Sequence, residues 1–287
     1  MVRDFRPTAT GCSLNPDPLQ VMVEKLSSAM SSDTCLVGAA CVSDTVLLSE
    51  NGRELAVQME DRIRRRLAGP PETPARAQRS RNMVIEQLSL QSIPLYASMR
   101  ATEIVISRTE MGQPILVQSN GFKIPNAHIS FSHDGGQHVA VLVVGNGICG
   151  IGTDIVHLPR LNRPENGDEF LMRFGSKFMS EREFSAFLRE ADASPDIPLL
   201  HRAAAHFSLM ESASKALGTG LKMGGGMGGD FSVPKQSIEI IGIDPVRFAL
   251  TGMADDRRIL LSGCKFAGHW QVDGEYLISM TILLSRD

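Results

Sequence analysis

The sequence of 287 residues predicts an α+β fold, a pseudo-dimer of two similar halves that each pack helices against an antiparallel sheet. Helical segments precede short strands with alternating apolar residues in residues 31–146, and the same order of elements returns in residues 147–287. Apolar residues make up 43% of the chain, which suffices for a core of this size. Residues 1–30 are rich in Ser, Pro and Asn, so we expect an N-terminal arm that is poorly ordered or forms a sheet edge.

The first half is expected to begin with an extended segment at residues 34–48 and a charged helix at residues 49–68. The sequence GPPETP at residues 69–74 ends that helix, because proline donates no backbone hydrogen bond and clashes with the preceding turn. A second helix is expected at residues 75–91. Four short strands follow at residues 103–107, 114–118, 128–132 and 138–144.

The second half is expected to open with a strand that runs from Gly152 to Leu158 and continues into a polar loop. A helix follows at residues 180–191, and the most strongly helical stretch of the chain lies at residues 206–221. A glycine-rich run at residues 223–229 is interpreted as a flexible surface loop. Closing strands are expected at residues 237–243, 246–252, 258–264, 265–272 and 275–284.

Composition and charge argue against several classes of function. The net charge of -3 and the content of two Tyr and one Trp give no electrostatic or stacking basis for binding nucleic acid. No apolar run is long enough to span a membrane and the first residues lack a secretory signal, so we expect a cytoplasmic protein without a membrane partner. The five cysteines are scattered without a CxxC pair, which indicates reduced thiols.

The sequence GNGICG at residues 145–150 has the glycine spacing of a dinucleotide-binding fingerprint. In such a site the third glycine opens a helix. Here the residues that follow, IGTDIV at 151–156, alternate and are rich in β-branched residues, which favours a strand. The sequence therefore argues against a nucleotide-dependent oxidoreductase. Alternation places Gly150, Gly152 and Asp154 on one face, where another body can lie close to the backbone. Asp154 then either caps a turn or carries a carboxylate into a site.

The helix HFSLMESASKALGTGL places Glu211 and Lys215 one turn apart on a polar stripe. This pair is either an ordinary surface ion pair or part of a site. Short side chains around the pair leave room for a ligand; they are Ser208, Ser212 and Ser214. Asp154 and Glu211 together could hold Mg²⁺, and a lysine beside them would meet a phosphate. The three residues together predict phosphoryl chemistry.

Four motifs within residues 110–221 resemble those of the 4′-phosphopantetheinyl transferase superfamily, in particular the holo-acyl-carrier-protein synthases. GIGTDIVHLPRL is similar to the metal-binding strand, FSLMESASKALGTGL to the conserved helix, HISFSHDGGQHVAVLVV to the Ser-His strand-turn-strand, and EMGQPIL to the Gly-Lys-Pro turn. The Ser-His motif precedes Asp154, as in the longer, monomeric, surfactin-type group. The resemblance therefore implies a monomer whose first half binds coenzyme A and whose second half binds the metal and is catalytic.

The resemblance implies an enzyme that moves phosphopantetheine from coenzyme A to a serine of an acyl or peptidyl carrier protein and releases 3′,5′-ADP. The carrier could belong to fatty-acid, polyketide or peptide synthesis. On the matching positions, Asp154 and Glu211 would hold Mg²⁺ against the pyrophosphate, and Glu211 would take the proton of the carrier serine, directly or through a metal-bound water. Lys215 would contact a phosphate or the leaving diphosphate.

The resemblance also implies binding residues around this centre. Ser132 and His133 would bind phosphates of coenzyme A, and Arg79 or Arg81 is a candidate for its 3′-phosphate, because an arginine fork fits phosphate oxygens.

An acidic carrier protein is expected to meet Arg160, six residues after Asp154. Arg173 and Lys177 would extend that surface, or else belong to a solvated loop face. The glycine-rich run at residues 223–229 would then be either an ordinary loop or a flap over the entrance for the carrier.

Three positions depart from the motifs. Met210 stands where the superfamily usually has a lysine, and Gln113 replaces the lysine of the Gly-Lys-Pro turn, so two expected cations are missing from the edge of the site. Val156 stands where the longer group has a third acid, which a water could replace. These losses motivate an alternative function, a catalytically weakened transferase-like module that binds a carrier protein within a synthase.

Overall fold

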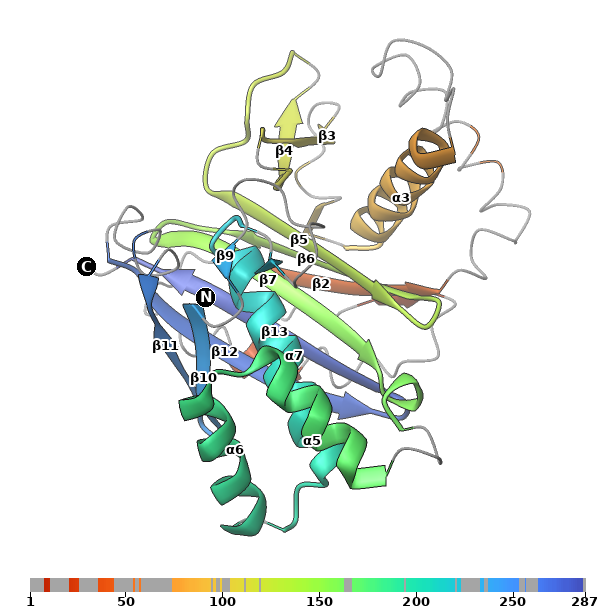
Figure 1. Ribbon diagram of the computed structural model, residues 1–287. Helices are drawn as coiled ribbons and strands as arrows, with labels where there is room; N and C mark the ends of the chain where they lie inside the picture. The colour runs from red at the N-terminus through yellow and green to blue at the C-terminus, as the bar shows by residue number, and fades with distance from the viewer. Residues whose placement is uncertain are drawn as a thin grey trace.

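The structure is a computed structural model that describes most of the chain from residue 74 onward and parts of the chain before it (Figure 1). The described residues are 8–10, 21–25, 36–43, 54, 57, 74–93, 95–96, 99, 104–110, 112–118, 120–162, 167–193, 195–219, 221–222, 233–234, 237–252, 256 and 263–285.

A four-stranded sheet in the order β1-β2-β6-β5 belongs to the first half. β2 (Leu36–Ser43) and β5 (Ala127–Asp134) both pair antiparallel with β6 (Gln137–Val144). β6 is rich in valine, whose branched side chain packs well on a pleated surface. β1 (Thr8–Thr10) lies parallel to β2 at the sheet edge, so the described part of the N-terminal arm includes an edge strand.

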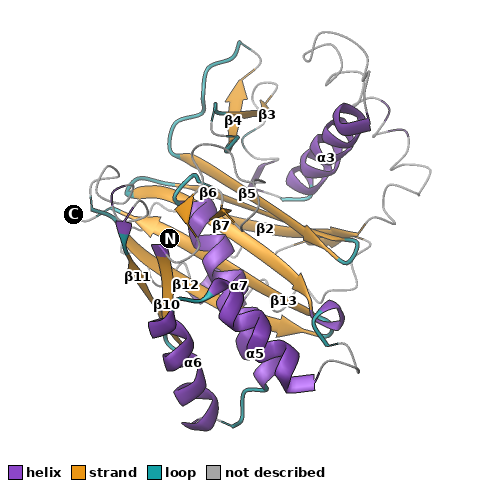
Figure 2. Cartoon of the chain, in the orientation of Figure 1, coloured by secondary structure: helices purple, strands orange, loops and turns teal. Residues whose placement is uncertain are grey.

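One long helix and one hairpin complete the first half. α3 (Pro74–Gln91) packs against β6 and β2, and it begins directly after the proline-rich break, with Pro74 in its first turn, where a missing N–H costs no hydrogen bond. β3 (Ile104–Arg108) and β4 (Pro114–Gln118) form an antiparallel hairpin beside it (Figure 2). The expected strands at residues 103–107 and 114–118 are thus confirmed within one residue.

A three-stranded antiparallel sheet in the order β12-β13-β7 belongs to the second half. Its members are β7 (Ile148–His157), β12 (Lys265–Asp273) and β13 (Tyr276–Leu284). A separate hairpin is formed by β10 (Ile238–Ile243) and β11 (Val246–Leu250). Short apolar runs predicted these strands, and β13 is buried on both of its faces.

Helix α7 (Leu199–Ala216) packs on this sheet, while α6 (Glu181–Ala193) packs on β10 and α5 (Gly167–Phe178) packs on α7. In Figure 1, α7 runs across β7 and β13, and α5 and α6 lie below it. A 3₁₀ turn follows β7 at Leu158–Arg160. The parallel pair of β8 (Leu221–Lys222) and β9 (Val233–Pro234) follows α7.

The two halves share one topology. In each, the first strand pairs with the last strand, which in turn pairs with the strand before it, giving β2-β6-β5 and β7-β13-β12. Each half also places a long helix, α3 or α7, and then a hairpin, β3-β4 or β10-β11, between its first strand and its final pair. The predicted α+β pseudo-dimer of two similar halves is therefore confirmed, and the expected boundary at residues 146–147 falls in the turn between β6 and β7.

Three apolar clusters separate the layers. One lies between α3 and its sheet and contains Leu90, Leu142 and Ile129. A second lies between the two sheets, where β2 and β6 face β7 and β13, and it also buries Met22 and Val23 of the N-terminal arm. The third, which we call the α7 core, lies between the second sheet, the β10-β11 hairpin and helices α5 to α7.

Some expected elements differ from the structure. α5 lies where a polar loop was expected, and α7 begins at Leu199, seven residues before the expected start. Gly263 and Cys264, in the strand expected at residues 258–264, lie outside any strand. The glycine-rich run at 223–229 lies outside the described residues, as does most of the helix expected at 49–68. Among the helices that the structure describes, none is both long and apolar enough to span a bilayer.

Candidate active site between the two halves

Side chains of β5 hold the edge of β7 where the two halves meet. Three alternate backbone N–H groups of β7 donate to side-chain oxygens of β5, an arrangement that we call the side-chain ladder. Its pairs are Thr153 N to Ser130 Oγ at 3.0 Å, Ile155 N to Ser132 Oγ at 3.4 Å, and His157 N to Asp134 Oδ2 at 2.8 Å. Because side chains alternate along a strand, the ladder sets the register of β5 on β7 and places Ser132 beside Asp154.

Helix α7 lies directly on the backbone of β7. A Cβ atom at Gly152 would overlap the carbonyl oxygen of Ser212, and one at Gly150 would overlap that of Ala216. The face free of side chains that the alternation predicted is therefore covered by α7, which brings Glu211 and Lys215 of this helix close to Asp154.

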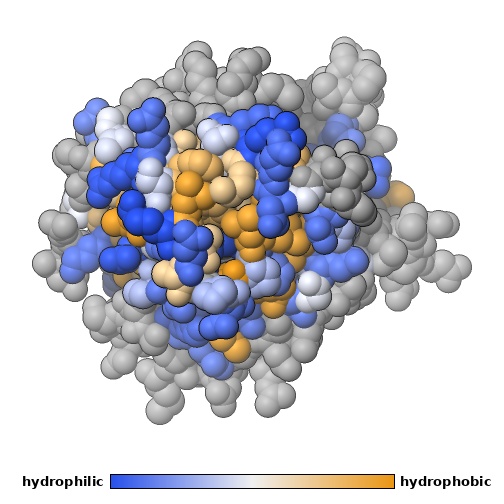
Figure 3. All heavy atoms as spheres, turned by 60° about the horizontal axis from the view of Figure 1, so that its bottom comes forward, coloured by the Kyte–Doolittle hydropathy of each residue, from blue (hydrophilic) through white to orange (hydrophobic). Residues whose placement is uncertain are grey.

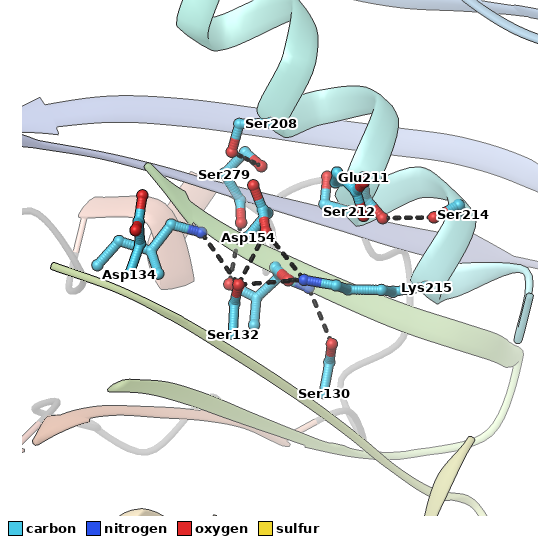
Figure 4. Close-up of polar contacts among 12 residues, drawn as sticks. Ser130, Ser132, Asp134, Asp154, Ser208, Glu211, Ser212, Ser214, Lys215 and Ser279 are labelled. Carbon is cyan, nitrogen blue, oxygen red and sulfur yellow. Dashed lines mark hydrogen bonds and ion pairs between the residues drawn. The ribbon is translucent and has the colours of Figure 1, made fainter. Parts of the chain in front are cut away.

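Asp154, Lys215 and Ser132 form one hydrogen-bonded group (Figure 4). The Lys215 ammonium donates to Asp154 Oδ1 at 2.9 Å, to Ser132 Oγ at 3.1 Å and to the Thr153 carbonyl at 2.9 Å. The Ser132 hydroxyl donates to the same Oδ1 at 2.8 Å. Within the described residues no ion pair joins Lys215 to Glu211, so the interpretation as an ordinary surface pair within the helix is wrong.

Glu211 is a partly buried carboxyl beside the same group. Its pKa is raised from 4.5 to about 7, mainly by burial and also by the negative charge of Asp154, while the positive charge of Lys215 opposes both. The charge effect of Asp154 means that the two carboxylates lie near each other. A carboxyl with a pKa near neutrality can both lose and gain a proton at physiological pH.

The two carboxylates fit a bound divalent cation. Asp154 is 7% exposed, and within the described part of the chain its Oδ2 has no hydrogen-bond partner although it is buried. A cation beside this oxygen would complete its coordination and would lower the energy of two neighbouring negative charges. No group of three or more His, Cys, Asp or Glu is arranged around a metal in the described residues, so water and substrate phosphates would supply the remaining ligands of Mg²⁺.

Comparisons with known proteins identify the family of this fold. The model of the 4′-phosphopantetheinyl transferase superfamily matches residues 150–280. A holo-[acyl-carrier-protein] synthase of Shewanella sediminis is 34% identical over 143 residues, which cover 48% of this chain and 98% of that protein. A second one, of Shewanella pealeana, is 32% identical over 144 residues, with the same coverage of 48% and 98%. The chain belongs to the 4′-phosphopantetheinyl transferase superfamily.

Solved structures of the same superfamily align with about half of the chain. The holo-(acyl-carrier-protein) synthase of Bacillus anthracis, in complex with CoA (3′,5′-ADP), is 21% identical and covers 48% of this chain and 98% of its own, with a TM-score of 0.32. The enzyme of Helicobacter pylori, in complex with coenzyme A, is 20% identical and covers 46% and 98%, with a TM-score of 0.32.

The serines of α7 do not leave room for a ligand, contrary to expectation. Ser208 and Ser212 are fully buried, and their hydroxyls pair with Ser279 Oγ at 2.8 Å and Thr281 Oγ1 at 2.7 Å on β13. Ser214 is also buried and donates to the Glu211 carbonyl at 2.8 Å. In this transferase the small side chains let the helix lie close to the sheet.

Two cavities flank Lys215 on the side of α3. One of about 250 Å³ is lined by Ser132, His133 and Lys215, three of the residues expected to bind phosphate. The other, of about 230 Å³, lies between the β3-β4 turn and the end of α7, with Gln113 and Arg108 in its wall. The structure therefore brings these residues of the two halves together, and their roles stay predictions.

The remaining coenzyme A candidates lie on or near α3. Arg81 is exposed and does not line either cavity, and the side chain of Arg79 lies outside the described residues. Sequence reasoning missed two residues that do line these cavities, Glu86 and Arg108, which form an ion pair between α3 and β3. Their separation of 22 residues gives no signal in the sequence, because it depends on how the hairpin packs.

The residues that depart from the motifs lie in different environments. Met210 is fully buried in the α7 core. A lysine at this position would be surrounded by apolar side chains. The Gln113 side chain lies against Gly218, at the end of α7, where its Oε1 is 2.7 Å from the position that a Cβ would occupy. Val156 is buried in the α7 core as well.

The expected carrier-binding residues lie on two elements. Arg160 follows β7, is half exposed, and pairs with Asp134 of the side-chain ladder, Nη2 to Oδ2 at 3.2 Å. Arg173 and Lys177 are exposed on α5, so they occupy a helix and not the expected loop. Figure 3 shows hydrophobic and hydrophilic residues interleaved on the face that comes forward from the bottom of Figure 1, where α5 and α6 lie.

Proposed function

We propose that this transferase moves 4′-phosphopantetheine from coenzyme A to a serine of an acyl or peptidyl carrier protein and releases 3′,5′-ADP. The arrangement of Asp154, Glu211 and Lys215 at the junction of the halves carries the proposal. In this proposal residues 31–146 contribute the coenzyme A-binding half, residues 147–287 the catalytic half, and one monomer holds a complete site.

Asp154 and Glu211 would hold Mg²⁺, which would offset the negative charge of the diphosphate as its bond breaks. Lys215 holds Asp154 in place and lines both cavities, so its positive charge lies near the space where the phosphates would bind. Because Ser132 donates to Asp154, its hydroxyl also orients the carboxylate.

The chemical step is an in-line displacement. The carrier serine oxygen forms a bond to the phosphorus that bears pantetheine, and the bond from that phosphorus to the oxygen shared with the adenosine-side phosphate breaks. The serine proton passes to Glu211, and the leaving 3′,5′-ADP takes the electron pair, with its new charge near Lys215.

Intact-mass spectrometry of several apo carrier proteins, incubated with the transferase, coenzyme A and Mg²⁺, tests this proposal. We expect a mass gain of one phosphopantetheine, lost in Glu211→Gln and after chelation by EDTA, and unchanged in Glu181→Gln, which alters an exposed glutamate. The absence of any gain, with carrier binding retained, would contradict the proposal and favour the non-catalytic carrier-binding module. That alternative now rests on Gln113, since Met210 lies in the core.

A further inference from the structure

Two histidines of neighbouring strands stack beside the site. His133 on β5 and His138 on β6 lie directly opposite each other in the strand register. Their ring centroids are 5.4 Å apart and their planes are inclined by 19°. Sequence reasoning selected His133 alone, because only His133 belongs to the Ser-His motif. The fold adds a second imidazole on the same face of the sheet.

Both rings line the cavity of about 250 Å³ that also contains Lys215 and Ser132. α3 closes the opposite wall with polar side chains, Asn82 and Ser89. The cavity therefore places two imidazoles beside Lys215 and Ser132, around a space that is large enough for a phosphate group.

One carboxylate shares this cavity. Glu86 of α3 lines it, and its charge acts on His133. Glu86 is held by Arg108, which binds both of its carboxylate oxygens and neutralises it. Lys215 is likewise paired with Asp154, so the two imidazoles are the groups through which this cavity can attract an anion.

Coenzyme A carries phosphate at two places, the diphosphate and the 3′-phosphate of its ribose. Asp154 and Glu211 would meet the diphosphate through Mg²⁺. The 3′-phosphate is a monoester with three free oxygens, so it offers more acceptor sites than either phosphate of the diphosphate. A pair of imidazoles matches these acceptors, since each ring can donate a separate hydrogen bond.

We propose that His138 is a second binding residue for the 3′-phosphate of coenzyme A, acting together with His133. This inference rests on the proposed function, because it assigns a phosphate of the same substrate. His138 and His133 would donate to different oxygens of the monoester, and the enzyme would distinguish coenzyme A from 3′-dephospho-coenzyme A.

Titration calorimetry with coenzyme A and with 3′-dephospho-coenzyme A tests the proposal on the full chain. His138→Ala should weaken coenzyme A binding by about tenfold or more and leave the binding of the dephospho compound unchanged. His138→Phe keeps a ring for stacking but has no N–H, so it should lose as much affinity as His138→Ala. His138→Gln keeps a hydrogen-bond donor and should therefore lose less affinity for coenzyme A than His138→Ala. Thermal melting of each variant shows whether it is folded.

Three results would overturn the proposal. Wild-type affinity in His138→Ala would remove His138 from the binding site. Full recovery in His138→Phe would mean that the ring only positions His133. An equal loss for both ligands would mean a general structural effect. If the wild-type protein bound neither ligand, the proposed function would fail with it, whereas the three results above leave that function intact.

Discussion

Glu211 combines two properties that conflict at the scale of a single residue. Its buried position beside Asp154 suits a metal ligand and a proton acceptor, but it makes the ionised carboxylate costly without a bound cation. Active sites commonly carry such a cost, because the interactions that stabilise the charge arrive with the substrate.

Glu211→Gln should therefore stabilise the metal-free protein at pH 8 by about 1–3 kcal/mol. The pKa of Glu211 is raised from 4.5 to about 7, so its contribution favours folding below pH 4.5 and is lost as the pH rises through 7. At pH 4 the substitution should have little effect on stability. Urea unfolding in EDTA at both pH values measures the difference, and an equal effect at the two pH values would contradict it.

Met210 allows a second test at the same scale. Met210→Lys restores the lysine that is usual in the superfamily, yet the side chain is fully buried in the α7 core. We expect a loss of about 2–4 kcal/mol of stability, because an ammonium would be buried among apolar side chains.

Met172→Lys provides the matched control for this change. Met172 packs on the same core from α5 but is partly exposed, so a lysine there can extend its charge to water. It should cost about 1 kcal/mol or less in the same urea titration. A Met210→Lys protein as stable as the wild type would mean that α7 shifts to release the lysine.

At the scale of elements, the site depends on how closely α7 lies against β7. Gly152→Ala should destabilise the protein by about 3 kcal/mol or more, because the new Cβ would overlap the Ser212 carbonyl and the backbone of a helix cannot move away locally. Chemical denaturation measures this loss.

Gly175→Ala on α5 is the control for Gly152→Ala. A Cβ at Gly175 would lie 3.3 Å from the Phe184 ring, which can rotate away, and alanine favours a helix over glycine. Its stability should stay within about 1 kcal/mol of the wild type. Equal losses of stability in the two variants would show that the close approach of α7 to β7 does not depend on the missing side chain at Gly152.

The sequence predicted elements well wherever one face is buried throughout. β4, β5, β6, β12 and β13 lie within two residues of their expected bounds, whereas β7 begins at Ile148, four residues before its expected start. α5 was missed because it begins at a glycine, contains Gly175 and follows Pro164, all of which usually indicate a loop. The start of α7 was missed because its N-cap is Pro198, which provides no side-chain cap.

The candidate site was predictable to a different extent. Motifs identified Asp154, Glu211 and Lys215, but spacing along the helix suggested that Lys215 pairs with Glu211. The true partner, Asp154, is 61 residues away, and only the packing of α7 across β7 brings the two together. The cavity residues Glu86, Arg108 and His138 were missed for the same reason, since they come from three other elements.

At the scale of the whole molecule, two partly buried histidines make stability depend on pH. Burial lowers the pKa of His128 on β5 and of His269 on β12 from 6.5 to about 4. Their contribution to the free energy of unfolding is therefore present above pH 6.5 and lost as the pH falls towards 4. This pH dependence is opposite to that of Glu211.

Between pH 7 and 4.5 the wild-type protein should lose about 2–4 kcal/mol through these two residues, after allowance for their partial exposure. A His128→Gln, His269→Gln double variant should lose correspondingly less over the same interval. Urea midpoints at the two pH values give both numbers. Parallel profiles for the two proteins would contradict the assignment.

The side-chain ladder has a consequence for dissecting the protein. A fragment that starts near residue 147 would leave the backbone N–H groups of Thr153, Ile155 and His157 open along β7, without the oxygens of β5. An open strand edge recruits other chains, so such a fragment should form edge-to-edge aggregates unless residues 1–146 are produced with it. Poor solubility of such a fragment would then result from the exposed edge of β7. It would not be evidence against a catalytic role for the residues that the fragment retains.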